Sequence, residues 1–268
     1  MTRTDVNAVA AAGAGKLALA RAHPGRYLSR AAMAGAFIMV GSLISSLSAA
    51  WFYTDQPAVA KLLGAFTFSA ALILIVLLGG ELFTGANFVM GVSLCERRVS
   101  FPGALRVWLL CYVGNFIGIF LLALLVAGSG ASGGLLSSYL AQTIPAKLAG
   151  TWYALLLKGV LCNFLVCVGV FSGFKLKSEA GKCIVIAAVI TTFVLAGFEH
   201  SIANMAAFSP VRPAGPRPGL RRHRLEHALG HPGQHDRRRR GPGPPPVAER
   251  GAGRRGLTPF PLLDRRNK

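Results

Sequence analysis

The sequence predicts an all-α membrane protein, an inverted repeat of three plus three helices with broken second and fifth helices and no sixth. Three observations support this. The 268 residues are 53% hydrophobic and 15% charged, with a mean hydropathy of +0.50, too apolar for an ordinary soluble domain. Five apolar runs are each long enough to cross a bilayer. The second and fifth runs end in similar polar clusters, which is typical of inverted repeats.

Residues 1–30 mix alanine with basic residues and are predicted to form a cytoplasmic amphipathic arm near the membrane surface. Two later connections, CERRVSFPGALR and KLKSEAGK, are also basic, whereas the other two connections are nearly neutral. Because basic loops stay in the cytoplasm, this alternation places the N-terminus there. The predicted spans are residues 31–53, 62–94, 104–127, 148–171 and 183–208.

The polar clusters GGELFTGAN (79–87) and GFEHSIAN (197–204) each contain glycine, glutamate, a hydroxyl residue and Ala-Asn. Unwound backbone at membrane depth survives only where it is buried in protein or lines a cavity. We expect Glu81 and Glu199 to tie down the breaks by accepting hydrogen bonds from the amides of the following half-helices. Asn87 and Asn204 are expected to satisfy carbonyls that the breaks leave free.

His200 lies beside Glu199 at the end of a run without charge. It reads either as a neutral imidazole in a helix interface or as a titratable pore residue, and the repeated break favours the second reading. No metal site or cofactor is expected, because no second histidine lies at helical spacing from it. A membrane enzyme using Glu199 and His200 is disfavoured, since adjacent helical residues point in different directions.

The net charge of +19 is concentrated in short connections and in the segment after Ser209, which holds about half of the lysines and arginines. This placement fits the positive-inside rule better than a nucleic-acid interface, so no nucleic-acid partner is expected. One alternative is a membrane anchor whose basic tail binds nucleic acid or anionic lipid.

Five stretches resemble the formate/nitrite transporter family: AAMAGAFIMVGS, GGELFTGANFVM, GNFIG, KGVLCNFLVCVGVF and GFEHSIANM, within about residues 30–205. The resemblance implies an aquaporin-like fold in the bacterial inner membrane, and a homopentamer when all six spans are present. Each protomer would have one pore for small monovalent anions, namely formate, nitrite or hydrosulfide, with protons as a second partner. It implies no enzyme activity.

The resemblance also implies roles for particular residues. His200 would be the central histidine, hydrogen-bonded to Thr84, and would donate a proton so that passage depends on pH. Lys147 would be a vestibule lysine that attracts anions, and Asn204 would line the pathway. The break would place Leu82, Phe83 and Thr84 at the midplane. The constrictions would be a cytoplasmic slit of Phe68, Leu72 and Phe193, and a periplasmic ring of Leu82, Phe193 and Val166 beside Asn163.

After Phe208 no sixth apolar run follows, and the Arg/Pro/Gly-rich composition of residues 209–268 predicts disorder. Codons for RHRLEHALGHPGQHDRR can be chosen so that reading one nucleotide later gives ATGWSTPWGTLGNMTGG. Its TLGN resembles the family's sixth span, so we hypothesise a frameshift within residues 205–210. The predicted domains are therefore an arm (1–30), a transporter domain (31–208) and an out-of-frame tail (209–268). Because the sixth span is missing, the chain as written is expected not to assemble a sealed pore.

Overall fold

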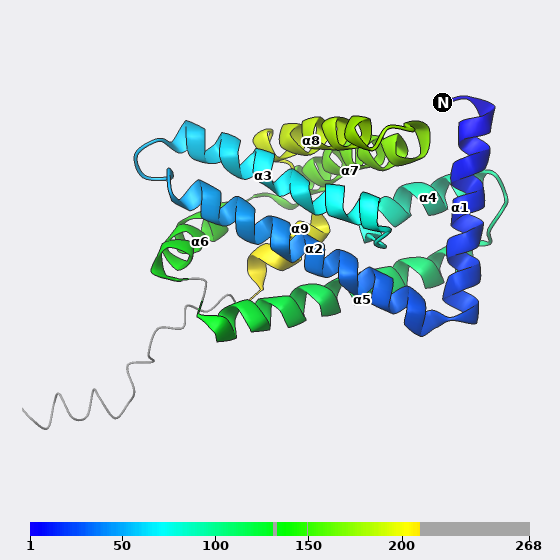
Figure 1. Cartoon of the computed structure of the whole chain (residues 1–268), viewed down its shortest axis with the longest axis horizontal. Coiled ribbons are helices and arrows are strands. Elements are labelled where there is room, and N and C mark those ends of the chain that lie inside the picture. The colour runs from blue at the N-terminus through cyan, green and yellow to red at the C-terminus, as the bar shows by residue number, and fades with distance from the viewer. Residues whose placement is uncertain (131–132, 149, 210–268) are drawn as a thin grey trace, which may run out of the picture. The chain divides into compact units, whose positions relative to one another are not determined.

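The computed structural model describes residues 1–130, 133–148 and 150–209. The predicted tail (209–268) lies outside these residues from residue 210 on, whereas the hypothesised frameshift (205–210) falls at the last described residues. Within them the chain is helical (Figure 1), which confirms the predicted all-α class. The helices are α1 (Arg3–Ala22), α2 (Pro24–Ala50), α3 (Pro57–Leu78), α4 (Phe83–Cys95), α5 (Phe101–Ser129), α6 (Gly133–Leu148), α7 (Trp152–Lys175), α8 (Glu179–Leu195) and α9 (Ser201–Phe208).

Helices α2, α3, α5 and α7 are long and apolar enough to cross a membrane. The second predicted span is α3 followed by α4, and the fifth is α8 followed by α9, so both expected breaks are present. The first span begins at Pro24, earlier than expected, because proline is favoured in the first turn of a helix. Arg30, expected in the arm, therefore lies inside α2.

The two breaks share one backbone geometry. Gly79 caps α3 with a φ of 70°, and Gly197 follows the last turn of α8 with the same φ of 70°. This left-handed conformation favours glycine, which has no Cβ to clash. Two residues after each glycine comes a glutamate, Glu81 or Glu199, and the next half-helix starts two residues later. The inverted repeat is therefore visible in the structure as well as in the sequence.

Helix α1 runs across the ends of the spanning helices rather than parallel to them (Figure 1) and packs mainly on α4. Arg3 pairs with Glu96 at the end of α4 (2.8 Å), and Lys175 at the end of α7 pairs with Asp5 (3.0 Å). The Thr2 backbone amide, together with Lys175, lowers the pKa of Asp5 to about 2. These pairs attach α1 to one end of the helix bundle.

Helices α2 and α5 approach closely along small residues. A Cβ added at Gly118 of α5 would lie 1.8 Å from the Ala32 carbonyl oxygen, and one at Gly114 would lie 2.5 Å from the Ala31 Cβ. Small residues at such crossings allow the tight backbone contact that holds membrane helices together. This contact positions Asn115, between the two glycines, against the break that follows α3.

Candidate functional site

Two cavities open toward opposite ends of the same helices. The first, here called the His200 cavity, has about 410 Å³ and is lined from α2 by Ser42, Ser45 and Ser46. The second, the Glu81 cavity, has about 280 Å³ and is lined from α2 by Arg30. Since a helix rises about 1.5 Å per residue, these linings lie well apart along α2. Helices α3 and α7 also contribute to both cavities, so the cavities share a common axis.

Apolar side chains separate the two cavities. Phe68 and Phe193 line the His200 cavity, and their rings meet edge to face with centroids 6.2 Å apart. Leu72 and Leu82 line the Glu81 cavity. These four residues and Val166 belong to one buried cluster, and none is more than 7% exposed. We call these five residues the apolar plug.

The structure divides the residues of the predicted constrictions between the two cavities. Phe193 was expected in both constrictions, with Phe68 and Leu72 in one and with Leu82 and Val166 in the other. Phe68 lines the same cavity as Phe193 and Lys147, whereas Leu72 lines the same cavity as Leu82. Phe68 and Leu72 lie one helical turn apart on α3, about 6 Å along the axis, which is enough to put them on opposite sides of the plug.

Phe83 was also expected on the pathway, which stays a prediction: it packs against the cluster that holds the apolar plug but lines neither the His200 cavity nor the Glu81 cavity. Its ring packs edge to face on Tyr112 at 5.2 Å, and it lines a separate cavity with Leu105 and Trp108 of α5. Phe83 is the first residue of α4 and Thr84 the second, so the helix turns their side chains in different directions.

His200 joins the two half-helices at the plug. The expected hydrogen bond is present, with 3.0 Å between Thr84 Oγ1 and His200 Nε2. The Ala203 backbone amide donates to His200 Nδ1 at 3.1 Å, so the imidazole is the N-cap of α9. The ring stacks on Phe193 at 5.9 Å and is only 5% exposed. Because Nδ1 accepts a hydrogen bond, the neutral ring carries its proton on Nε2, which faces Thr84.

The carboxylate of Glu81 does not bind the amides of the next half-helix, contrary to the prediction. It accepts hydrogen bonds from Lys16 of α1 and from the Tyr27 hydroxyl (3.3 Å). Asn115 of α5 performs the expected role: its Oδ1 accepts from the Phe83 amide at 2.9 Å, and its Nδ2 donates to the Glu81 carbonyl at 2.8 Å. Asn115 also donates to the Ala31 carbonyl, at 2.8 Å.

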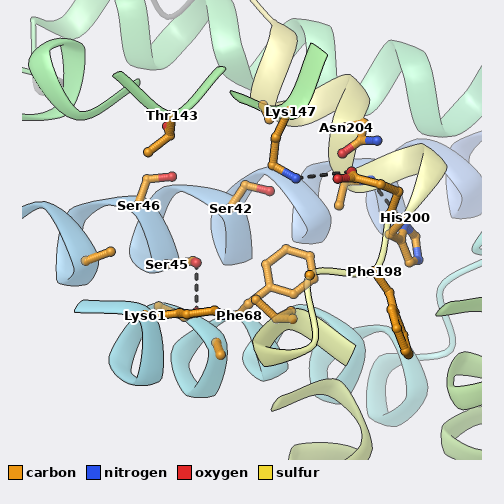
Figure 2. A pocket seen from close by; sticks show the side chains of 18 of the residues that line it. Ser42, Ser45, Ser46, Lys61, Phe68, Thr143, Lys147, Phe198, His200 and Asn204 are labelled. Atoms are coloured by element: carbon orange, nitrogen blue, oxygen red, sulfur yellow. Dashed lines mark hydrogen bonds and ion pairs between the residues drawn. The ribbon is translucent and has the colours of Figure 1, made fainter. Parts of the chain in front are cut away.

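The second break follows the same plan with different residues. Glu199 pairs with Lys147 of α6 at 3.2 Å, as Glu81 pairs with Lys16 of α1. The cap on the following half-helix comes from His200, so the predicted role of Glu199 is also wrong. Figure 2 shows Lys147 reaching toward the chain beside His200 and Asn204, with Ser42, Ser45 and Ser46 in a row along α2.

The two predicted asparagines occupy different surroundings. Asn204 lines the His200 cavity, as expected (Figure 2). Asn163 donates from Nδ2 to the Cys167 sulfur at 3.7 Å, and its buried Oδ1 has no hydrogen-bond partner among the described residues.

Sequence reasoning missed Lys16, Asn115 and Lys158. Asn115 and Lys158 gave a usable signal, because each is a polar or charged residue inside an apolar run.

Replacing Asn115 with alanine should lower stability by about 2–4 kcal/mol, since a fully buried residue would lose three hydrogen bonds and leave the Phe83 amide without its partner. The midpoint of thermal unfolding in detergent would measure this loss. Asn87→Ala, in which the residue lines only the outer cavity beside Phe83, is the matched control and should stay near the parent value. Equal midpoints for the two variants would contradict the assignment of Asn115.

Comparison with known proteins gives consistent matches. The sequence model of the formate/nitrite transporter family matches residues 3–213. The chain is 34% identical to the transporter YwcJ of Bacillus subtilis over 185 residues, covering 69% of this chain and 72% of that protein. It is 32% identical to the nitrite transporter NirC of Escherichia coli (strain K12) over 211 residues, covering 77% and 76%.

Two solved structures have the same fold. One, described as an FNT family ion channel, superposes with a TM-score of 0.72 at 28% identity, covering 78% of this chain and 84% of that chain. The other, a pentameric formate channel with formate bound, has a TM-score of 0.61 at 30% identity, covering 68% and 72%.

Proposed function

This chain belongs to the formate/nitrite transporter family, and on that premise we propose that it moves formate or nitrite across the membrane through a path in each protomer. The path runs from one cavity to the other through the apolar plug. Helices α2, α3, α5 and α7 make the chain a multi-pass membrane protein, and its relatives are transporters and channels rather than enzymes. The enzyme alternative is therefore set aside.

One observation supports the proposal most strongly: His200 and Thr84 face each other at 3.0 Å beside an apolar barrier. An anion entering that barrier would lose its hydration, and a low-dielectric environment favours the neutral form of an acid. Formate and nitrite are conjugate bases of weak acids, so one added proton makes either able to cross. A proton donor beside the barrier meets that need.

The geometry suggests how His200 donates. In the neutral ring Nδ1 is occupied by the Ala203 amide, and Nε2–H points to Thr84. Protonation at Nδ1 displaces that amide and makes the ring an imidazolium. The Nε2–H bond then breaks, an O–H bond forms on the anion, and the ring is left neutral with its proton on Nδ1. Loss of that proton to water and uptake of one from water at Nε2 restores the starting tautomer. Because the imidazolium must form before each transfer, passage should increase as pH falls.

The proposal also covers the oligomeric state, the membrane orientation, the path residues and the substrate class. A homopentamer is proposed because a related solved structure is a pentameric formate channel. The N-terminus is assigned to the cytoplasmic side of a bacterial inner membrane by the basic connections. Thr84, Asn204 and Lys147 are assigned to the path, with Asn163 beside Val166. Hydrosulfide, a third small monovalent anion, stays within the proposed substrate class.

Uptake of radiolabelled formate and of nitrite into proteoliposomes tests the proposal. We expect the version with a restored sixth span, in which the pore is sealed, to take up both above protein-free liposomes, with sulfate excluded because its double charge cannot be removed by a single proton. Uptake no faster than through the lipid alone would contradict a transport role. Equal uptake of sulfate would contradict the mechanism based on neutralisation.

A further inference from the structure

Each cavity contains a second cation that occupies the same place in the repeat. Arg30 is the seventh residue of α2 and lines the Glu81 cavity. Lys158 is the seventh residue of α7 and lines the His200 cavity. Helices α2 and α7 are the first spans of the two halves, each preceded by a helix whose lysine pairs with a break glutamate. The correspondence between Arg30 and Lys158 therefore follows the inverted repeat.

The first cation of each cavity is neutralised, whereas the second is not. Lys16 is paired with Glu81, and Lys147 with Glu199. Among the described residues, neither Arg30 nor Lys158 forms an ion pair. A lysine whose charge is balanced by a carboxylate attracts an incoming anion less than an unpaired cation in the same cavity. The positive charge that no carboxylate balances in each cavity therefore comes largely from the second cation, Lys158 in the His200 cavity and Arg30 in the Glu81 cavity.

Two other lysines line these cavities and can be distinguished from this pair. Lys182 in the Glu81 cavity is paired with Glu179 at 3.0 Å. Lys61 in the His200 cavity is exposed in the second turn of α3, where solvent can screen its charge, whereas Lys158 is half-buried. Arg30 is exposed as well, and it differs from Lys182 in having no carboxylate partner among the described residues.

Lys158 faces the protein interior rather than lipid. Its neighbours Leu157 and Val160 are each 60% exposed, on the outer face of α7. Lys158 itself is half-buried and lies four and eight residues before Cys162 and Val166, which are 1% and 0% exposed. Residues at this spacing share one face of a helix. An ionisable residue inside a span that faces a cavity is costly to keep, which points to a functional role.

We propose that Lys158 and Arg30 are the anion-binding residues of the two mouths, holding a small monovalent oxyanion before it reaches the plug. This inference rests on the proposed transport function and assigns its entry sites. In the His200 cavity the Ser42 side chain (Figure 2) lines the same space as Lys158 and provides a hydroxyl donor for the oxyanion. Lys147 then serves mainly to hold Glu199 and the break, with a smaller part in attraction.

Thermal unfolding of the purified full chain in detergent, titrated with sodium nitrite against sodium gluconate at equal ionic strength, tests the inference without requiring flux. A ligand that binds the folded state raises the unfolding midpoint in a concentration-dependent way. Lys158→Gln should raise the apparent Kd for nitrite about tenfold. Lys158→Arg keeps the charge and should restore binding to within about twofold, which separates lost charge from misfolding.

Matched variants complete the design. Lys147→Gln combined with Glu199→Gln, which removes a neutral pair and leaves the charge of the cavity unchanged, should weaken nitrite binding less than Lys158→Gln. Lys177→Gln, in the exposed α7–α8 connection, should leave binding unchanged. At the other mouth, Arg30→Gln should weaken binding, whereas Arg26→Gln on the same helix should not.

The outcomes separate the two claims. If the parent chain binds nitrite and Lys158→Gln binds it equally well, the inference is overturned while the transport proposal stands. A larger loss in the Lys147→Gln/Glu199→Gln double variant than in Lys158→Gln also overturns it. If nitrite gives the parent chain no stabilisation beyond that of gluconate, the proposed anion path itself is wrong.

Discussion

Replacing His200 with asparagine should remove the pH dependence of formate transport and lower uptake at pH 5.5 by about a hundredfold. Asparagine is a favoured N-cap residue, so it can still accept the Ala203 amide and begin α9. It has no titratable proton, and loss of a positioned proton donor typically costs about 10²–10⁴ in rate. Uptake of radiolabelled formate by proteoliposomes between pH 5 and 8 measures both effects.

A second variant separates proton donation from folding. His200→Phe should lose the same pH dependence and also about 1 kcal/mol of stability, since phenylalanine cannot cap the helix. The midpoint of thermal unfolding should therefore fall in His200→Phe and stay nearer the parent value in His200→Asn. A parent-like pH profile in either variant would show that His200 is not the proton donor.

Restoring a sixth span should increase formate uptake by about tenfold or more over the chain as written. The structural reason is an uncovered face on α7. In the first half of the repeat α5 packs along α2, but among the described helices none takes that place on α7. Only 17% of the residues in the apolar stretch of α7 are buried, against 33% in α2. Leu156, Val160 and Phe164 of α7 are between 59% and 65% exposed.

The comparison uses two coding sequences that differ by one nucleotide after the codon for Ala207. Both proteins are purified, reconstituted at equal density and measured for formate uptake against protein-free liposomes. Resequencing of the natural gene across the same codons shows which version the cell makes. Equal uptake by the two versions would mean that the uncovered face of α7 does not limit transport.

The helix breaks could be predicted from the sequence because their signal is local. Glycine followed by glutamate inside an apolar run is rare, and its recurrence at Gly79 and Gly197 identifies the repeat. The bond between Thr84 and His200 could be expected from the family resemblance, and it is present at 3.0 Å. The part these two residues play in transport stays a prediction.

The residues that hold the breaks could not be predicted because they come from distant segments. Asn115 reaches the Glu81 carbonyl from 34 residues away, and Lys16 reaches its carboxylate from 65 residues away. An apolar run in the sequence predicts where a helix spans the membrane. It does not predict which side chain of a neighbouring helix will contact the break in that span. Helix α6 was missed for another reason: its Gly/Ser-rich start and internal Pro145 hide its helical pattern.

The most direct test of the mechanism is whether formate crosses with a proton. Proteoliposomes loaded with a pH-sensitive dye receive formate outside at pH 5.5, and acidification of the lumen is followed together with formate uptake, after subtraction of protein-free liposomes. We expect one proton to enter with each formate, with no need for a potassium ionophore to balance charge. Formate uptake that leaves the lumen pH unchanged and stops without the ionophore would show that the bare anion crosses the plug, and would contradict proton donation by His200.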